Sequence, residues 1–226
     1  MYKYPLTFTF PAFAFTATIT AKDATGNVVF TAAKKLISSK EEVNVSAGGQ
    51  ALYKIISEEN RITDIPSNWD ILTPDGQKLG VVDDDFISAI DTSKFIQGRG
   101  AQIMANMDIE RALNLKALKM YWIKDASGRK VGLIAPEKES MLAMQLPLYQ
   151  IVRQLPIFFR FITPHYYIRL GEETVMYMEK KQTFFTDTYV LEVRGKFTDK
   201  DEPLLINSVL LALVYERQRL KDLYGG

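Results

Sequence analysis

The segment that most constrains the fold is an unbroken apolar run near the end of the chain, residues 204–215. It follows Asp201, Glu202 and Pro203, which favour a helix start because acidic groups suit the positive end of the helix dipole and proline tolerates the first turn. The run is apolar nearly all round for three turns, so other parts of the protein must surround it. At about 18 Å, it is too short to cross the roughly 30 Å hydrocarbon core of a bilayer. We therefore expect a buried central helix over residues 204–223.

Four hairpin patterns precede this segment and supply strands that can surround it. Each has two stretches of alternating apolar and polar residues joined by a glycine-containing turn, which is typical of a β-hairpin. The turns are at residues 23–26, 74–76, 125–128 and 171–173. Asp23, Asp75 and Asp125 are interpreted as turn formers rather than metal ligands, because aspartate side chains accept hydrogen bonds from nearby backbone amides.

The number of strand candidates predicts the fold class. Further candidates lie at residues 35–39, 42–45, 51–57 and 188–195, which brings the expected total to about a dozen. A sheet of that size is expected to close, since closure removes exposed edges. The sequence thus predicts a mainly β (α+β) fold, a closed antiparallel barrel of about twelve strands around the C-terminal helix, as one domain over residues 1–226.

One stretch, residues 86–118, fits the barrel pattern least and is expected to be an insertion. Within it, residues 107–118 favour a helix by composition. Their apolar alternation is equally consistent with a strand that continues into the third hairpin. Both alternatives remain open at this point.

Composition excludes several classes of function. The 226-residue chain has 28 Lys and Arg against 27 Asp and Glu, and a net charge of +1 argues against a globally basic nucleic-acid-binding protein. Cysteine is absent and His165 is the one histidine, which excludes disulfides, thiolate nucleophiles and multi-histidine metal sites. Residues 48–49 and 97–100 lack the spacing and the lysine of phosphate-binding loops. We therefore expect no enzymatic activity and no cofactor.

Two titratable features are interpreted as structural. The consecutive acidic residues 83–85 point in different directions, so they are expected to form a solvated strand end rather than a cation site. His165 has no nearby Ser or Asp motif, so we interpret it as a structural side chain rather than a general base. No catalytic residue and no metal site is predicted.

The order of these features resembles a known superfamily. The hairpin turns, the apolar Pro-containing stretch before Pro-His-Tyr-Tyr-Ile at residues 164–168, and the ending at residues 193–217 are similar to the tubby C-terminal, phospholipid scramblase and LURP-one-related superfamily. The resemblance covers most of residues 8–221. It implies a barrel of about twelve strands around a central helix, phosphoinositide binding as in tubby proteins or lipid movement as in scramblases, and no enzymatic activity.

Functional residues of the superfamily do not carry over cleanly. The acidic, calcium-linked segment of scramblases has its nearest match at residues 198–202, which is short, contains Lys200 and lacks the residue order of a calcium loop. Their lipid-bearing cysteine cluster has no counterpart here. We therefore predict no calcium site.

The functional hypothesis is binding to anionic phospholipid at a membrane surface. Basic side chains attract head groups, each contributing roughly 1 kcal/mol, while aromatic side chains contact the interface. The candidate residues are Lys34, Lys35, Lys40, Arg153, Phe158, Phe159, Arg160, Lys180 and Lys181. Two alternatives remain open. Residues 141–162 would simply cap the barrel mouth, or the barrel would be a structural or protein-interaction scaffold in which this segment contacts a second copy or a protein partner.

The ends and the longest apolar stretches of the chain suggest a location. Residues 1–6 lack the basic and apolar regions of a secretory signal. Residues 141–162 are interrupted by polar side chains and by Pro147 and Pro156, so they are not expected to span a membrane. We expect a cytoplasmic protein, peripheral to the membrane if it binds lipid.

Overall fold

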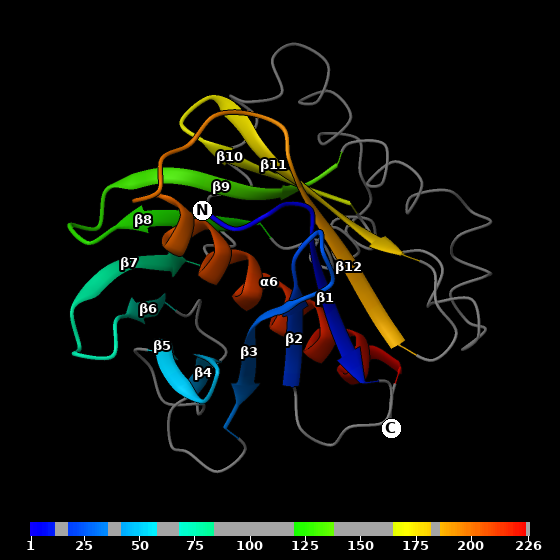
Figure 1. Cartoon of the computed structure of the whole chain (residues 1–226). Coiled ribbons are helices and arrows are strands. Elements are labelled where there is room, and N and C mark those ends of the chain that lie inside the picture. The colour runs from blue at the N-terminus through cyan, green and yellow to red at the C-terminus, as the bar shows by residue number, and fades with distance from the viewer. Residues whose placement is uncertain are drawn as a thin grey trace.

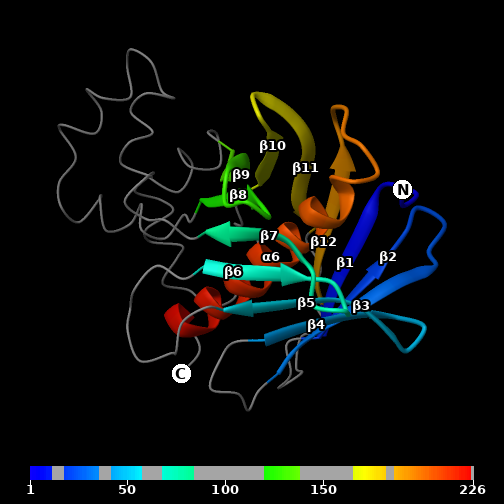
Figure 2. The same cartoon turned by 90° about the vertical axis from the view of Figure 1, so that its left-hand side faces the viewer.

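The first and last strands of the sheet pair with each other, and this pairing closes the sheet into a barrel. The computed structural model describes residues 1–11, 18–35, 42–57, 68–83, 120–137, 165–181 and 186–224, in which twelve strands follow one another around the barrel in chain order. Each strand is antiparallel to both of its neighbours. The predicted fold class, a closed antiparallel barrel around a C-terminal helix, is confirmed (Figures 1 and 2).

The elements have ordinary lengths for a barrel of this kind. The strands are β1 (Leu6–Pro11), β2 (Thr18–Lys22), β3 (Val28–Lys34), β4 (Glu42–Ala47), β5 (Gln50–Ser57), β6 (Asn68–Leu72), β7 (Lys78–Asp83), β8 (Tyr121–Asp125), β9 (Lys130–Pro136), β10 (Tyr166–Leu170), β11 (Glu173–Lys181) and β12 (Thr186–Val193). The helix α6 (Glu202–Tyr224) begins two residues before the predicted start and ends one residue after the predicted end.

The four predicted hairpins join β2 to β3, β6 to β7, β8 to β9 and β10 to β11. Asp23 and Asp125 form turns as predicted, since each Oδ1 accepts hydrogen bonds from amides two and four residues later, at 2.9 to 3.0 Å. In the second hairpin Thr73 takes this position, and its Oγ1 accepts from the Gln77 amide at 3.0 Å. Asp75 supports that turn by accepting a hydrogen bond from the Thr73 hydroxyl.

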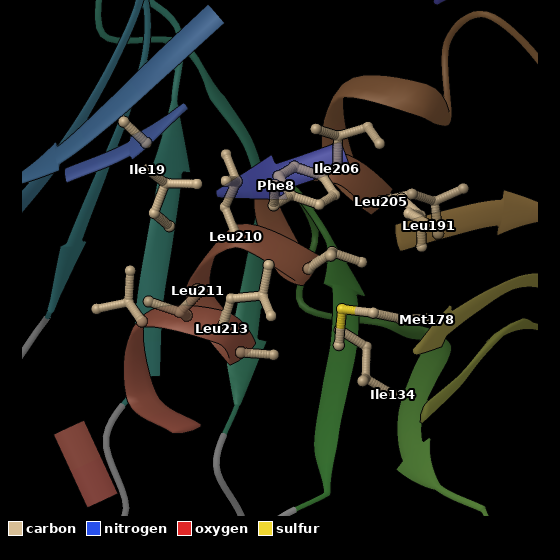
Figure 3. Close-up of a cluster of buried hydrophobic side chains, with 14 of the residues drawn as sticks. Phe8, Ile19, Ile134, Met178, Leu191, Leu205, Ile206, Leu210, Leu211 and Leu213 are labelled. Atoms are coloured by element: carbon tan, nitrogen blue, oxygen red, sulfur yellow. The ribbon is translucent and has the colours of Figure 1, made fainter. Parts of the chain in front are cut away.

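Apolar side chains from all of the described strands and from α6 fill the inside of the barrel. Side chains two apart along a strand share a face, so Phe8 and Phe10 of β1 both point inward and are fully buried. In α6, residues 205–214 are buried without interruption, which confirms that protein surrounds the helix. Figure 3 shows Leu210 of the helix lying between Phe8 and Ile19 of the barrel wall.

Local contacts let the helix carry polar groups and approach the wall closely. Asn207 Nδ2 donates to Pro203 O and Ser208 Oγ donates to Leu204 O, each at 2.7 Å, so both buried side chains bond to a carbonyl one turn earlier. On the opposing β7, a Cβ added at Gly80 would lie 2.6 Å from Leu204 Cδ1. Glycine at this position therefore allows the first turns of α6 to pack against the sheet.

The up-and-down order gives the barrel two different ends. The hairpin end carries the short turns between β2 and β3, β4 and β5, β6 and β7, β8 and β9, and β10 and β11, together with the start of α6. At the exit end, α6 leaves the barrel beyond Tyr215, and β1–β2, β3–β4, β5–β6, β7–β8, β9–β10 and β11–β12 are connected. Figure 1 shows α6 starting beside the N-terminus and running to the opposite end.

The predicted insertion at residues 86–118 belongs to the connection between β7 and β8 and lies outside the described residues. The choice between helix and strand for residues 107–118 therefore stays a prediction. Residues 141–162, expected to cap the barrel mouth or contact a partner, belong to the connection between β9 and β10 and also lie outside the described residues.

Candidate functional site

The predicted lipid-binding residues on the described strands stand at the exit end. Lys34 ends β3 and Lys35 follows it, while Lys180 and Lys181 end β11. Because β12, β1 and β2 lie between these strands, the two lysine pairs are separated by four strand spacings, or about 19 Å along the barrel wall. The other candidates, Lys40, Arg153, Phe158, Phe159 and Arg160, lie outside the described residues, in the connections between β3 and β4 and between β9 and β10.

The Lys34 side chain lies on the inner face of the barrel wall, at its rim. Lys34 is paired in register with Val43 and shares a strand face with Ala32, and both of these side chains are buried. Its Nζ lies 5.6 Å from the centre of the Tyr215 ring, in a cation–π contact. The adjacent Lys35 is exposed. This pair thus presents one ammonium group at the rim of the interior and one in solvent.

The lysines at the end of β11 are paired with carboxylates. Lys180 Nζ lies 2.9 Å from Asp187 Oδ1 and 5.7 Å from the centre of the Tyr189 ring, and its side chain is 7% exposed. Lys181 is exposed and forms an ion pair with Glu179. Both ammonium groups of this pair are therefore engaged within the protein, one inside the barrel and one on its outer face.

An aromatic contact closes the barrel beside Lys34. Trp69, the second residue of β6, packs on Tyr215 of α6 with ring centroids 4.5 Å apart and an interplanar angle of 51°. Trp69 is 3% exposed, and within the described part of the chain its Nε1 is a buried donor without a hydrogen-bond partner. Buried indole N–H groups usually have an acceptor.

Sequence analysis missed Trp69 and Tyr215 as site residues. The available signal was position: Trp69 precedes the inward-facing Ile71 by two residues, and Tyr215 directly follows the buried run of the helix. Neither signal shows that the two rings meet, because β6 and α6 are far apart in the sequence. Only the closed barrel brings them together.

Four polar side chains cluster on the outer face, where β9, β10 and β11 reach the exit end. Tyr177 Oη and His165 Nδ1 are 2.6 Å apart, Tyr167 Oη donates to Glu137 Oε1 at 2.8 Å, and His165 Nδ1 lies 3.3 Å from Glu137 Oε2. Burial, and then the charge of Glu137, raises the pKa of Tyr177 to about 12, so its phenol is protonated at neutral pH. These contacts hold the His165 ring between strands, and the expectation that it has no catalytic role stays a prediction.

The first residue of the acidic run at residues 83–85 forms an ion pair. Asp83 Oδ2 lies 2.5 Å from Lys124 Nζ of the neighbouring strand β8, and residues 84–85 lie outside the described set. Among the residues that the structure describes, no group of three or more His, Asp and Glu side chains could hold a metal ion. The prediction that the chain has no metal site is not tested by this finding.

Residues 198–202, the nearest match to a calcium-linked segment, form the turn that leads into α6 and the first residue of the helix. The Asp201 carboxylate accepts hydrogen bonds from the Thr198 amide at 3.0 Å and from its hydroxyl at 2.7 Å. Glu202 is buried, and its Oε1 accepts from the Tyr2 amide and the Tyr4 hydroxyl, each at 2.9 Å. These carboxylates anchor the helix start and the N-terminal segment at the hairpin end.

A scan against protein-family models, a search of curated proteins and a search of solved structures all return no match. Within the described ranges, no helix is both long enough and apolar enough to cross a membrane. Function is therefore inferred from the geometry of this chain alone.

Proposed function

We propose that the barrel binds anionic phospholipid at a membrane surface through its exit end. The observation that carries the proposal is that the exposed Lys35 and the rim-lying Lys34 stand together on that one end. A membrane is a surface, so basic groups that attract it must share a side of the protein. The up-and-down order of the barrel meets this requirement.

Within the described ranges, Lys34 and Lys35 are the basic groups that we assign to attracting the anionic membrane surface. Each lysine near an anionic surface contributes roughly 1 kcal/mol, so the pair contributes about 2 kcal/mol. Lys35 is exposed, and Lys34 lies at the rim beside Tyr215. Lys180 has a different role, because its side chain is 7% exposed and is paired with Asp187. We assign it to holding the mouth of the barrel in shape.

We also propose kinship with the tubby C-terminal, phospholipid scramblase and LURP-one-related superfamily. A closed barrel around a buried C-terminal helix is the architecture that this resemblance implies, which supports the proposal. The cytoplasmic leaflet carries the anionic lipids of a cell. Peripheral attachment to that leaflet is the location that follows from the proposed function.

Vesicle sedimentation tests the proposal. The protein is mixed at low salt with vesicles of phosphatidylcholine alone or containing phosphatidylserine or a phosphoinositide, and the bound fraction is measured after centrifugation. We expect binding to the anionic vesicles that weakens as salt is added, because exposed charges are screened. The absence of sedimentation with every anionic composition would overturn the proposal.

A matched pair of double variants tests which end binds. Lys34→Gln with Lys35→Gln removes about 2 kcal/mol of attraction, so we expect roughly 30-fold weaker partitioning. The control, Lys22→Gln with Lys196→Gln, removes the same charge from two exposed residues at the hairpin end. It should bind almost as well as the unaltered protein. Equal losses in both variants would contradict binding through the exit end.

A further inference from the structure

Acidic side chains stand on the outer face around most of the exit end. Among the described residues, Glu42 begins β4, Asp83 ends β7, Glu137 follows β9 and Glu179 lies near the end of β11. Side chains alternate between the two faces of a strand, and a neighbour of each of these residues along the chain is buried. An anionic membrane repels carboxylates, so these parts of the rim are poorly suited to face one.

One arc of the exit end has no outward carboxylate within the described ranges. It consists of the exit halves of β12, β1, β2 and β3, which are neighbours in the sheet and lie side by side in Figure 1. The outward residues of this arc are Thr188, Thr9, Thr20 and Thr31, which stand opposite one another in one row, and Thr186, Thr18 and Ala33 nearer the rim. Asp187 of β12 points inward, where it pairs with Lys180. We call these outward residues the neutral arc.

The neutral arc is accessible from outside the barrel. Its threonines are partly exposed and Ala33 is exposed, whereas residues that alternate with them along the strands, such as Phe8 and Ile19, are buried in the core. A closed barrel is curved, so a flat surface meets only a few neighbouring strands at once. An arc of adjacent strands is therefore the part of the wall that one membrane surface contacts.

A basic side chain stands at the edge of the neutral arc. Lys35 follows β3, and its amide donates to the Glu42 carbonyl at 2.8 Å, so the strand pairing continues through it. Because Lys34 points inward, Lys35 points outward, and it is exposed. Glu42 borders the arc on β4, where its carboxylate is paired with Lys54 at 3.2 Å. The arc thus lies beside a cation and carries no carboxylate of its own.

The sequence of the adjoining connections continues this charge pattern. Residues 12–17 connect β1 to β2 and residues 182–185 connect β11 to β12, and both segments lie outside the described residues. By composition they contain four phenylalanines, Phe13, Phe15, Phe184 and Phe185, and no charged residue. Apolar and aromatic residues beside basic ones are typical of segments that contact a membrane interface. The lack of charge therefore extends in the sequence beyond the strands of the arc.

We propose that the neutral arc is the side of the barrel that faces the membrane, so that the protein lies tilted on an anionic bilayer with β12, β1, β2 and β3 toward the head groups. This inference rests on the proposed function and names the surface through which that function operates. Threonine hydroxyls donate hydrogen bonds to the phosphate and ester oxygens of head groups. Lys35 adds the attraction of a cation at the edge of the contact.

A single fluorescent label tests which side faces the membrane. The chain has no cysteine, so one introduced cysteine takes an environment-sensitive fluorophore at a known position. Thr20→Cys places the label within the neutral arc. Ala135→Cys is the control, a partly exposed position on the outer face of β9, five strand spacings away. With vesicles of phosphatidylcholine containing phosphatidylserine or a phosphoinositide, we expect the emission of the Thr20 label to move to shorter wavelength and that of the Ala135 label to change little. Equal shifts at the two positions would overturn the inference.

Charge substitutions at the same two positions test the contact without a label. Thr20→Glu should weaken partitioning onto anionic vesicles about fivefold, and Thr20→Lys should strengthen it about fivefold. Opposite responses of this kind do not arise from a loss of folding, which would weaken binding in both variants. Ala135→Glu and Ala135→Lys are the controls and should change partitioning little. Thr20 variants that bind alike would contradict a membrane contact at the neutral arc.

Sedimentation of the unaltered protein separates this inference from the proposed function. If it sediments with no anionic vesicle, the proposed function is overturned, and the membrane-facing arc with it. If it sediments but the label and the charge variants at Thr20 behave like those at Ala135, the inference is overturned and the proposed function stands. Sedimentation together with opposite responses of Thr20→Glu and Thr20→Lys supports both.

Discussion

The two ends of the barrel are built from different chemistry. At the hairpin end, aromatic rings close the interior, with Tyr2 packed on Phe30 and Tyr4 packed edge-on to Phe197, and Glu202 joins the N-terminal segment to the helix start. At the exit end, Lys34 and Lys180 lie on the inner face of the wall. Charge is costly to bury, and the two ends hold it differently: Glu202 accepts hydrogen bonds from the N-terminal segment, whereas Lys180 is held by its ion pair with Asp187.

The largest effect on this division is expected from Gly80→Ala, which disturbs the docking of α6 from the hairpin side. The new Cβ would lie 2.4 Å from Lys124 O and 2.6 Å from Leu204 Cδ1, so the backbone must move. We expect a loss of about 3 kcal/mol in the free energy of unfolding, measured by urea denaturation. The control Gly128→Ala meets no atom within 4 Å and tests only the strain of its φ of 83°, about 1 kcal/mol. Equal losses would contradict the close approach of Gly80 to the β8 backbone and to Leu204 of the helix.

The next effect concerns the charge inside the exit end. Lys180→Met leaves Asp187 with its ion-pair partner removed, and breaking a buried pair costs about 3–5 kcal/mol. The Asp187 side chain is 25% exposed, so we expect a smaller loss of about 2 kcal/mol. The double variant with Asp187→Leu should recover most of it, as measured by thermal and urea unfolding. A single variant as stable as the unaltered protein would show that this pair is not a constraint on the barrel.

A smaller effect is expected at the hairpin end from Glu202→Ala. The change leaves the Tyr4 hydroxyl and the Tyr2 amide without their shared acceptor, at a cost of about 1–2 kcal/mol. Glu179→Ala is the control, because it removes a carboxylate from an ion pair on the outer face at the exit end and should cost less than about 0.5 kcal/mol. Chemical denaturation of both variants measures the difference. If the two variants lost equal stability, Glu202 would not anchor the N-terminal segment more strongly than Glu179 stabilises the outer face.

The smallest effect is a pH dependence of stability that comes from two carboxylates in the hairpin turns. Hydrogen bonds from the side chains of Thr25 and Ser127, and then from local amides, lower the pKa values of Asp23 and Asp125. The stability that these two carboxylates contribute is therefore present when the pH is above their unfolded pKa of about 4. It is lost as the pH falls through their lower pKa values in the folded protein. Asp23→Asn with Asp125→Asn should lower the urea midpoint at pH 7 but not at pH 2. Thr73→Val, at the equivalent turn position, should lower it equally at both.

The sequence was sufficient for the barrel and for the position of its helix. Hairpin turns act over a few residues, and an apolar run such as residues 205–214 has no stable position on a surface, so both can be recognised locally. The exit-end contacts were not predictable in this way. Lys180 and Asp187 are close in sequence, but their inward direction depends on the register of the barrel. The contact between Trp69 and Tyr215 depends on closure of the whole sheet.

The chain order of the barrel has a consequence for how the protein is made. Every strand of the wall precedes the helix that fills it, and β1 must pair with β12 across most of the described chain. The twelve strands therefore leave the ribosome before the helix that completes the core. Contacts this distant in sequence form slowly, and unpaired strands are prone to aggregate. The nascent chain is thus most vulnerable just before α6 emerges, when holding by a chaperone would matter most.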